Sequence, residues 1–302
     1  MRIGVDLGGT KIEAIAMDPG GSELVRRRVP TPKRDYEGTV QAIVDLVEGI
    51  ERELGETGTV GVGTPGAISP ATGLIKNANS VALNGRPLDK ALEAGLSRPI
   101  RMTNDANCFA LSEATDGAAA GAEVVFGVIL GTGVGGGVVV RGQVLNGPNA
   151  IAGEWGHNPL PQPTDDERPG PECYCGRRGC IETFLSGPGL ERDFHVVVGR
   201  RESAKAIARL ADAGDSDAVS AMQRYEDRLA RALGALINIL DPDAIVLGGG
   251  VSNIDRLYDR VPEIWGQYVF SDRVDTRLVK AMHGDSSGVR GAAWLWPRGG
   301  GG

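Results

Sequence analysis

The sequence predicts an α/β protein built from two related domains that face one another across a cleft. An apolar strand, a Gly-rich turn and a second apolar strand occur twice, as "RIGVDLGGTKIEAIAM" from residue 2 and as "VFGVILGTGVGGGVVV" from residue 125. One such hairpin opens each half of the chain, and helical patterns follow. The length of 302 residues also exceeds one typical core and suggests two domains.

The first half alternates helical and strand patterns after its hairpin. Residues 36–54, "YEGTVQAIVDLVEGIEREL", carry apolar side chains at helical spacing. Residues 59–69, "TVGVGTPGAIS", are expected to form a buried strand that ends in a Gly/Pro loop. The polar run at 104–107, "NDAN", is expected to start an Ala-rich helix.

The second half continues in the same manner. A long helix is expected over residues 217–240, and it leads through Asp241 and Pro242 into the strand "AIVLGGG" at 244–250. Residues 284–296, "GDSSGVRGAAWLW", predict a final helix. Strands that alternate with helices are typical of α/β folds.

Composition and charge narrow the function classes. The formal net charge is −7, with no basic arm or Lys/Arg block, which argues against a nucleic-acid partner. No apolar stretch approaches membrane-spanning length, and the chain enters a strand-like run at once, so neither a membrane partner nor a signal peptide is expected. The expected compartment is the cytosol, where stable disulfides are rare.

The Gly-rich turn of the second hairpin matches a dinucleotide fingerprint at Gly131, Gly133 and Gly136. That fingerprint requires a helix to follow, whereas the strand-like residues Val138 to Val140 follow here. The Walker pattern is absent from the sequence as well. Both Gly-rich turns therefore suit phosphate binding by a route other than the Rossmann or P-loop motifs.

Three of the four cysteines lie within eight residues, "CYCGRRGC" at 173–180. Cys173, Cys175 and Cys180, with His157 sixteen residues upstream, form a tetrahedral set of ligands suited to Zn²⁺. A disulfide would leave an odd thiol, and a redox motif would more usually read Cys-x-x-Cys. We expect a structural zinc site, with Cys108 a buried apolar residue.

Six motifs in order resemble the ROK family of repressors, open reading frames and kinases. They are "DLGGTK" (6–11), "NDAN" (104–107), "GTGVGGG" (131–137), "GEWGHNPL" (153–160), "CYCGRRGCIETF" (173–184) and "LGGG" (247–250). The resemblance runs from Met1 to about Pro297. The stretches "KNANS", "NDANC" and "HGDSSGVRGAAWLWP" look most like the bacterial fructokinases (manno(fructo)kinases) of the family.

The resemblance implies the actin-like (ribonuclease H-like) ATPase fold, with two α/β domains around a central cleft. Its first domain would comprise residues 1–118 and 290–298, and its second residues 119–289. ATP and Mg²⁺ are the expected cofactors, with Asp6 positioned to orient Mg²⁺ through its water shell. The implied nucleotide-binding residues are Gly4, Asp6, Gly8, Gly9, Thr10, Lys11, Gly131, Thr132, Gly133, Gly135, Gly136, Gly248 and Gly249.

Asp105 is the expected catalytic residue, because a carboxylate can accept the sugar hydroxyl proton as the γ-phosphoryl group arrives. Its alternative role is a helix N-cap, which Asp commonly fills. Zinc would fix one ring nitrogen of His157 and leave the other for hydrogen bonding. The implied substrate-binding residues are Gly66, Asn79, Asn104, Asp105, Glu154, His157 and Glu182.

The expected activity is ATP-dependent transfer of a phosphoryl group to the 6-hydroxyl of D-fructose, with mannose as a second substrate. Glucokinase and N-acetylhexosamine kinase of the same family remain alternatives. A ROK transcriptional regulator would need an N-terminal helix-turn-helix, whereas the phosphate hairpin starts here at Ile3. An actin-like assembly protein would leave Glu154, His157 and Glu182 unexplained. The resemblance also implies a homodimer.

Overall fold

The computed structural model describes residues 1–78 and 81–297. The chain divides into two compact units, of which the first comprises Met1–Gly121, Gly137–Ala152 and Met282–Gly302, and the second Ala122–Gly136 and Gly153–Ala281. The domain boundaries inferred from the sequence stay a prediction. They differ from these units mainly at residues 137–152, which the sequence analysis placed in the second domain. Among the described residues, every helix is too short or too polar to cross a membrane.

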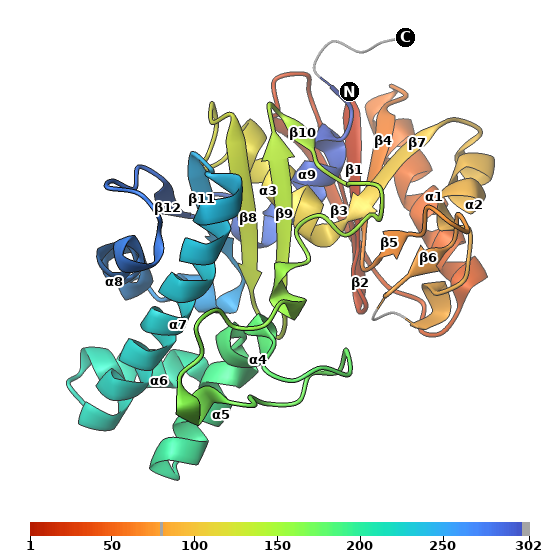
Figure 1. The fold of residues 1–302 in the computed structure, drawn as a ribbon. Coiled ribbons are helices and arrows are strands. Elements are labelled where there is room, and N and C mark those ends of the chain that lie inside the picture. The colour runs from red at the N-terminus through yellow and green to blue at the C-terminus, as the bar shows by residue number, and fades with distance from the viewer. Residues whose placement is uncertain (79–80, 298–302) are drawn as a thin grey trace. The chain divides into compact units, whose positions relative to one another are not determined.

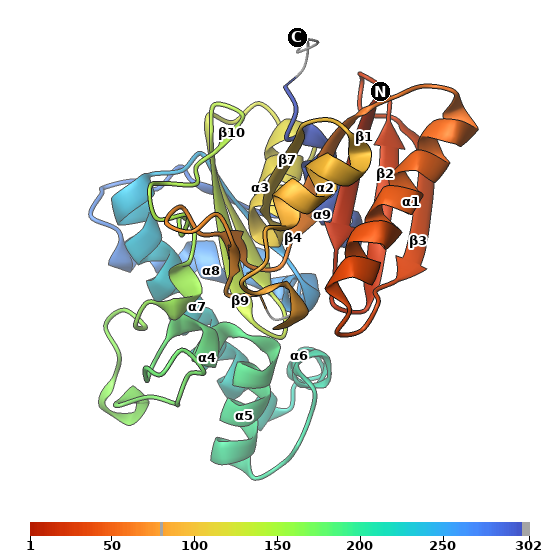
Figure 2. The same cartoon turned by 90° about the vertical axis from the view of Figure 1, so that its right-hand side faces the viewer.

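The first unit contains a five-stranded sheet in the order β3-β2-β1-β4-β7. Its strands β1 and β2 are antiparallel, and β1, β4 and β7 run parallel. Figure 1 and Figure 2 show this sheet with its helices. The strands are β1 (Arg2–Leu7), β2 (Lys11–Met17), β3 (Glu23–Pro30), β4 (Thr59–Thr64) and β7 (Ile100–Asn104), and a separate two-stranded sheet pairs β5 (Ala67–Ile68) with β6 (Ile75–Lys76).

Four α-helices accompany these strands. They are α1 (Tyr36–Leu54), α2 (Leu88–Leu96), α3 (Asp105–Thr115) and α9 (Ser287–Trp294), with the short 3₁₀ turns η1 (Val81–Leu83) and η6 (Gly284–Ser286). The predicted range of α1 is confirmed. Its cap Asp35 accepts a hydrogen bond from the Gly38 backbone N–H, and Gly55 ends it in the left-handed region.

Alternation along β1 separates its two faces. Ile3, Val5 and Leu7 are buried in the apolar core that includes α1 and α2 residues. Gly4 points to the opposite face, where a Cβ atom would lie 2.1 Å from the Val289 carbonyl oxygen of α9. Its register partner Gly61 on β4 would clash with Ala292 in the same way, at 1.8 Å. The two glycines therefore let α9 pack directly on the sheet.

A buried carboxylate fastens the start of this final helical segment to α3. Glu113 is fully buried, and its oxygens accept hydrogen bonds from the backbone N–H groups of Ala118, Met282 and His283 and from the Ser287 hydroxyl. These donors satisfy the hydrogen-bonding capacity of the buried carboxylate oxygens. The segment around η6 is thereby positioned by α3.

The second sheet has the strand order β10-β9-β8-β11-β12, and β9 begins in the second unit and ends in the first. Strand β11 lies parallel to both β8 and β12. The strands are β8 (Val124–Leu130), β9 (Val134–Val140), β10 (Gln143–Val144), β11 (Ala244–Gly248) and β12 (Arg277–Lys280). The helices of the second unit are α4 (Ile181–Leu185), α5 (Gly187–Val198), α6 (Ala204–Asp212), α7 (Ser216–Leu240) and α8 (Arg256–Trp265).

The segment between His157 and Cys173 is anchored to α7 by buried ion pairs between side chains. Glu167 ends the 3₁₀ turn η3 (Asp165–Glu167), and its carboxylate accepts hydrogen bonds from Arg228 and Arg231. Burial raises its pKa, but hydrogen bonds from the two arginines outweigh this effect and lower the pKa of Glu167 to about 2. This paired network fixes the long connection that carries the cysteines.

Candidate active site and metal centre

Asp105 is the first residue of α3, and it is not the cap of that helix. The cap is Asn104, whose Oδ1 accepts a hydrogen bond of 2.7 Å from the Asn107 backbone N–H. The Asp105 side chain remains open to solvent on one side, although protein atoms crowd its carboxylate and raise its pKa. The Ala106 backbone N–H donates to its Oδ1 and opposes that rise in part. Asp105 is therefore free of the capping role and accessible.

A second carboxylate lies near it, at the end of β1. Burial raises the pKa of Asp6 to about 6, and the negative charges of Asp105 and Glu13 add to the effect, which Lys11 opposes. A Cβ atom at Gly288 would lie 3.3 Å from Asp6 Oδ2, so that the start of α9 reaches this carboxylate. A buried carboxylate whose ionisation is further disfavoured by a neighbouring carboxylate suits a bound cation such as Mg²⁺.

The Gly8–Lys11 turn connects β1 and β2 beside Asp6. The Gly8 N–H donates to the Lys11 carbonyl oxygen at 3.0 Å. The Lys11 side chain is half exposed, and its Nζ lies 3.5 Å from the buried Glu13 carboxylate. The predicted residues Asp6, Gly8, Gly9, Thr10 and Lys11 thus gather at one end of the hairpin. Gly4 lies against α9, which gives it a packing role, and its contact with nucleotide stays a prediction.

The second Gly-rich turn is tied to α4 and α5. The Val134 N–H donates to Glu182 Oε2 at 2.9 Å, and a Cβ atom at Gly133 would lie 2.7 Å from the same oxygen. The Gly187 N–H, at the start of α5, donates to the Gly131 carbonyl oxygen. The predicted sugar residue Glu182 is therefore attached to the predicted phosphate turn, a link that sequence reasoning missed.

Of the remaining glycines in the predicted nucleotide site, some lie close to this turn and others do not. Gly248 ends β11, and Gly249 packs against the Leu130 backbone at the end of β8. Gly136 instead lies against Trp155 and the Gly153 backbone, inside the unit. Its surroundings explain the glycine by packing, and a nucleotide contact there stays a prediction, as it does for Thr132 and Gly135.

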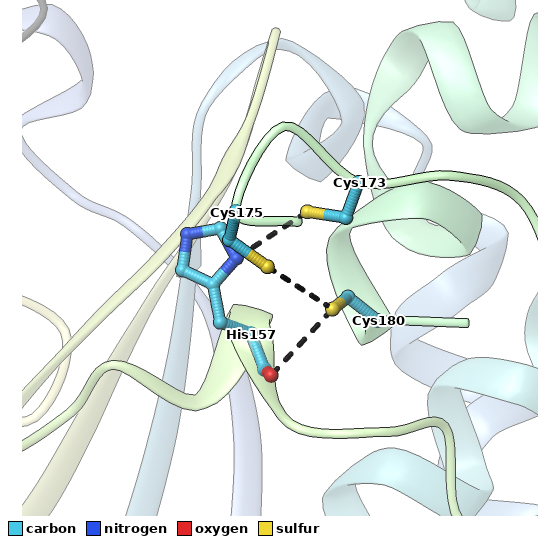
Figure 3. Close-up of side chains that lie close together, drawn as sticks. All are labelled: His157, Cys173, Cys175 and Cys180. Atoms are coloured by element: carbon cyan, nitrogen blue, oxygen red, sulfur yellow. Dashed lines mark hydrogen bonds between the residues drawn. The ribbon is translucent and has the colours of Figure 1, made fainter. Parts of the chain in front are cut away.

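His157, Cys173, Cys175 and Cys180 form a compact cluster in the second unit (Figure 3). One ligand atom from each lies within 4.8 Å of all the others. The His157 Nδ1 to Cys173 Sγ distance is 3.5 Å, and the Cys175 Sγ to Cys180 Sγ distance is 3.7 Å. A tetrahedral site with Zn–S bonds of about 2.3 Å and a Zn–N bond of about 2.0 Å requires edges of about 3.5 and 3.8 Å. The four side chains therefore fit a closed zinc site.

The electrostatics of the thiols agree with a cation at this place. Burial and the two neighbouring thiols raise the pKa of Cys180. A backbone N–H from Arg177 leads the interactions that lower the pKa of Cys175. Three thiolates at such distances repel each other strongly, and a divalent ion is the usual means of ionising them together. Cys108, by contrast, is buried in α3, as predicted, and has no place in the cluster.

The predicted sugar-binding residues of the second unit belong to this cluster or lie within three residues of a member along the chain. Glu154 is exposed and precedes the 3₁₀ turn η2 (Trp155–His157), which Trp155 anchors through a hydrogen bond to the Gly135 carbonyl oxygen. The second ring nitrogen of His157, Nε2, lies 2.9 Å from the Tyr174 hydroxyl. Tyr174 is 84% exposed, and sequence reasoning gave it no role.

In the first unit, a pocket of about 230 Å³ adjoins the predicted sugar residues. Asn104 lines the pocket, and so do Thr64 and Ala67. Thr64 lies two residues before the predicted residue Gly66, and Ala67 follows it directly. Asn107 and Asn146 also line it, and neither was predicted as a site residue. Asn79 lies outside the described residues, so its predicted role stays a prediction.

Comparison with known proteins identifies the family of the chain. The family model described as "ROK family" matches residues 2–299. The chain belongs to the ROK family. The chain is 41% identical over 299 residues to a protein from Pectobacterium atrosepticum named N-acetyl-D-glucosamine kinase, and the match covers 98% of each protein.

Solved ROK structures share the fold. The ROK hexokinase from Thermus thermophilus superimposes with a TM-score of 0.86 at 36% identity, covering 97% of each chain. A ROK family glucokinase from Streptomyces griseus, solved in complex with glucose and AMPPNP, gives a TM-score of 0.77 at 30% identity and 99% coverage of each chain. The protein is thus a ROK sugar kinase, and its predicted actin-like fold is confirmed. The fructokinase pattern is not confirmed.

Proposed function

We propose that this ROK sugar kinase transfers the γ-phosphoryl group of ATP to the 6-hydroxyl of N-acetyl-D-glucosamine. The observation that carries the proposal is 41% identity to an N-acetyl-D-glucosamine kinase over 98% of both chains. The sequence analysis favoured D-fructose and left an N-acetylhexosamine kinase open. The full-length similarity supports that alternative.

Asp105 is proposed to act as the general base. Its carboxylate accepts the proton of the sugar 6-hydroxyl as the O6–P bond forms and the bond from the γ-phosphorus to the β-phosphate oxygen breaks, releasing ADP. Crowding by protein atoms raises the pKa of Asp105, which brings the group closer to the operating pH of a base. Asn104 is proposed to hold the sugar beside it through its NH₂ group.

The nucleotide is proposed to contact two Gly-rich turns and the end of β11. The Gly8–Lys11 turn offers backbone N–H groups, the Thr10 hydroxyl and the Lys11 ammonium to the phosphates. Gly131 to Gly133 offer a second turn, and Gly248 and Gly249 provide space for adenosine. When bound, Mg²⁺ neutralises charge on the phosphate oxygens. Asp6 is the residue proposed to hold it, through its water shell.

Zinc is proposed to have a structural role. The four protein ligands leave no open coordination position, which excludes direct activation of substrate in such a site. Holding Cys180 and His157 together would fix Glu182, two residues beyond Cys180, and Glu154, three residues before His157. Glu154, His157 and Glu182 are proposed to bind the sugar hydroxyl groups.

The proposed reaction is tested by product analysis. Purified protein is incubated with Mg-ATP and N-acetyl-D-glucosamine, and the product is examined by ¹H–³¹P correlation NMR. We expect equimolar ADP and a phosphorus signal coupled to the two H6 protons. Absence of a phosphorylated sugar, or phosphorus coupled only to the anomeric proton, would contradict the proposal.

A substitution at Tyr174 tests the proposed role of His157. The Tyr174 hydroxyl occupies the ring nitrogen that the sugar is proposed to use, so a sugar hydroxyl must replace it. Tyr174→Phe keeps the edge-on ring contact with His157 and removes this competitor. We expect sugar affinity to rise by about 2- to 10-fold, the equivalent of one hydrogen bond. Calorimetric titration measures it, and an unchanged or weaker affinity would show that the hydroxyl does not compete.

The raised pKa of Asp6 predicts that the free energy of unfolding of the metal-free protein depends on pH. Because its pKa is higher in the folded protein than in the unfolded chain, folding is favoured by the protonated form, and stability is lost as pH rises from about 4 through 6. Metal-free Asp6→Asn should therefore be more stable than wild type at pH 8, by up to about 3 kcal/mol, and similar at pH 4. Urea unfolding at both pH values measures the free energy of unfolding. Equal stability of the two proteins at pH 8 would show that the pKa of Asp6 is not raised in the folded protein.

A further inference from the structure

A threonine that is not among the predicted site residues fastens the Gly8–Lys11 turn. Thr31 follows β3 directly, and its hydroxyl donates to the Gly8 carbonyl oxygen at 2.7 Å. Its backbone N–H donates to the Thr10 carbonyl oxygen at 3.0 Å. A backbone carbonyl oxygen can only accept, so the direction of both hydrogen bonds is fixed. One residue therefore holds two of the carbonyl groups in the turn.

These two hydrogen bonds set the direction of the peptide planes in the turn. In a trans peptide, the C=O group and the N–H group of the next residue point in opposite directions. Because the Gly8 carbonyl oxygen points to Thr31, the Gly9 N–H points away from it. Gly9 is exposed, and its N–H makes no hydrogen bond to a backbone carbonyl of the residues that the structure describes. The turn thus keeps carbonyl oxygens on the Thr31 side and offers the Gly9 donor to an anion on the other side.

The Gly8–Gly9 pair explains why this fastening matters. Glycine has no Cβ atom and adopts positive and negative φ with similar ease, so the peptide between two glycines can rotate at little cost. A rotated peptide would direct a carbonyl oxygen, in place of an N–H, toward a bound phosphate, and the oxygens would repel each other. The Thr31 hydroxyl opposes this rotation because its partner is the carbonyl oxygen of that same peptide.

Thr31 is itself restricted by its two neighbours in the chain. Pro30 and Pro32 flank it, and Pro30 is the register partner of Lys11 across the β2–β3 pair. A residue that precedes proline is disfavoured in the helical region and adopts an extended conformation, which continues the direction of β3. This conformation keeps the Thr31 N–H beside Thr10. The backbone therefore supports the side chain that contacts the turn.

We propose that Thr31 is a positioning residue for the phosphates of ATP. It acts through the turn, because its hydroxyl holds the Gly8–Gly9 peptide in the orientation that donates to phosphate. The inference rests on the proposed function, since it requires that the Gly8–Lys11 turn binds the nucleotide phosphates. It adds a residue that lies outside the six motifs quoted for the family.

The test removes the Thr31 hydroxyl and keeps the shape of the side chain. Thr31→Val retains the branched side chain and the backbone N–H, and it should weaken binding of the ATP analogue AMPPNP with Mg²⁺ by about 3- to 10-fold, the equivalent of one hydrogen bond. Thr31→Ser retains a hydroxyl and should stay within about 2-fold of wild type. Affinity for N-acetyl-D-glucosamine should be unchanged in both variants. Calorimetric titration measures each affinity.

Two further variants make the comparison specific. Thr39→Val is the matched control, because it removes a hydroxyl that donates to the Asp35 carbonyl oxygen at 2.6 Å, at the start of α1 in the same unit. It should bind AMPPNP as wild type does. Lys11→Gln removes the ammonium group proposed to contact the phosphates and should weaken AMPPNP binding whether or not Thr31 has a role. Thermal unfolding confirms that each variant is folded, and Thr31→Ala supplies the test if Thr31→Val does not fold.

Failure of the proposed function and failure of this inference give different results. Equal AMPPNP affinity in wild type and Lys11→Gln, or no AMPPNP binding by wild type, would overturn the proposed nucleotide site and this inference with it. A weaker Lys11→Gln together with an unchanged Thr31→Val would overturn the inference alone. So would a Thr31→Val variant that loses affinity for AMPPNP and for the sugar to the same extent, because the hydroxyl would then only support the fold of the first unit.

Discussion

Replacing Asp105 with asparagine is expected to lower kcat by about 10²- to 10⁴-fold, the usual contribution of a general base. The substitution keeps the size of the side chain and removes the carboxylate that is proposed to accept the 6-hydroxyl proton. Affinity for the sugar and for an ATP analogue should change little, because Asn104 and the Gly-rich turns are unaltered. Steady-state kinetics and calorimetric titration measure the two effects separately.

A matched control separates catalysis from helix capping. Asp35 caps α1 in the same unit through a hydrogen bond from Gly38, and Asp35→Asn should leave kcat within a few-fold of wild type. The structure already assigns the cap of α3 to Asn104. If Asp105→Asn also kept kcat within a few-fold, Asp105 would have no catalytic role.

The second large effect is expected at the metal cluster. Cys175→Ser removes one thiolate from a closed set of four ligands, so the variant should lose zinc or bind it much more weakly. Sugar affinity should fall sharply, since His157 and Glu182 depend on the cluster for their positions. Affinity for an ATP analogue should change less, because the Gly8–Lys11 turn lies in the other unit and only the Gly131–Gly133 turn is tied to Glu182.

Elemental analysis and calorimetry test this prediction together. Cys108→Ala removes the one cysteine outside the cluster and is expected to retain one equivalent of zinc. A wild-type protein that is fully active without zinc would refute the metal. A folded, zinc-free Cys175→Ser variant that binds sugar normally would leave the ligands assigned and remove their proposed role.

Local pattern was sufficient for much of the fold. The two hairpins, α1 and the final helix could be predicted because apolar periodicity and capping residues act within a few positions along the chain. The zinc ligands could be predicted for a similar reason, since three of them lie within eight residues. Their chemistry is specific enough that spacing alone indicates a metal.

Packing between distant segments could not be predicted in this way. Gly4 and Gly61 accept α9, which lies more than two hundred residues later in the chain, and no local signal marks that contact. Gly4 was assigned to nucleotide by resemblance, whereas its surroundings in the structure are the helix backbone. Asn107 and Asn146 meet across 39 residues, so their pocket appears only once the chain is folded.

The choice of sugar was also beyond motif reading. The motifs quoted for the ROK family contain the groups proposed to bind ATP and the sugar ring, and relatives named for different sugars belong to the same family. Discrimination between hexoses depends on one or two contacts with a substituent, each contributing about 1–3 kcal/mol. A side chain outside the shared motifs can supply that difference without changing any of them.

A competition experiment tests the central claim most directly. Wild-type protein is given limiting Mg-ATP with equimolar N-acetyl-D-glucosamine, glucose, mannose and fructose. The sugar phosphates are separated by chromatography, because the hexose phosphates are isomers of equal mass, and are quantified by mass spectrometry at low conversion. Product ratios then equal the ratios of kcat/KM. We predict that N-acetyl-D-glucosamine 6-phosphate is the dominant product. Fructose 6-phosphate or glucose 6-phosphate in excess over it would contradict the assignment.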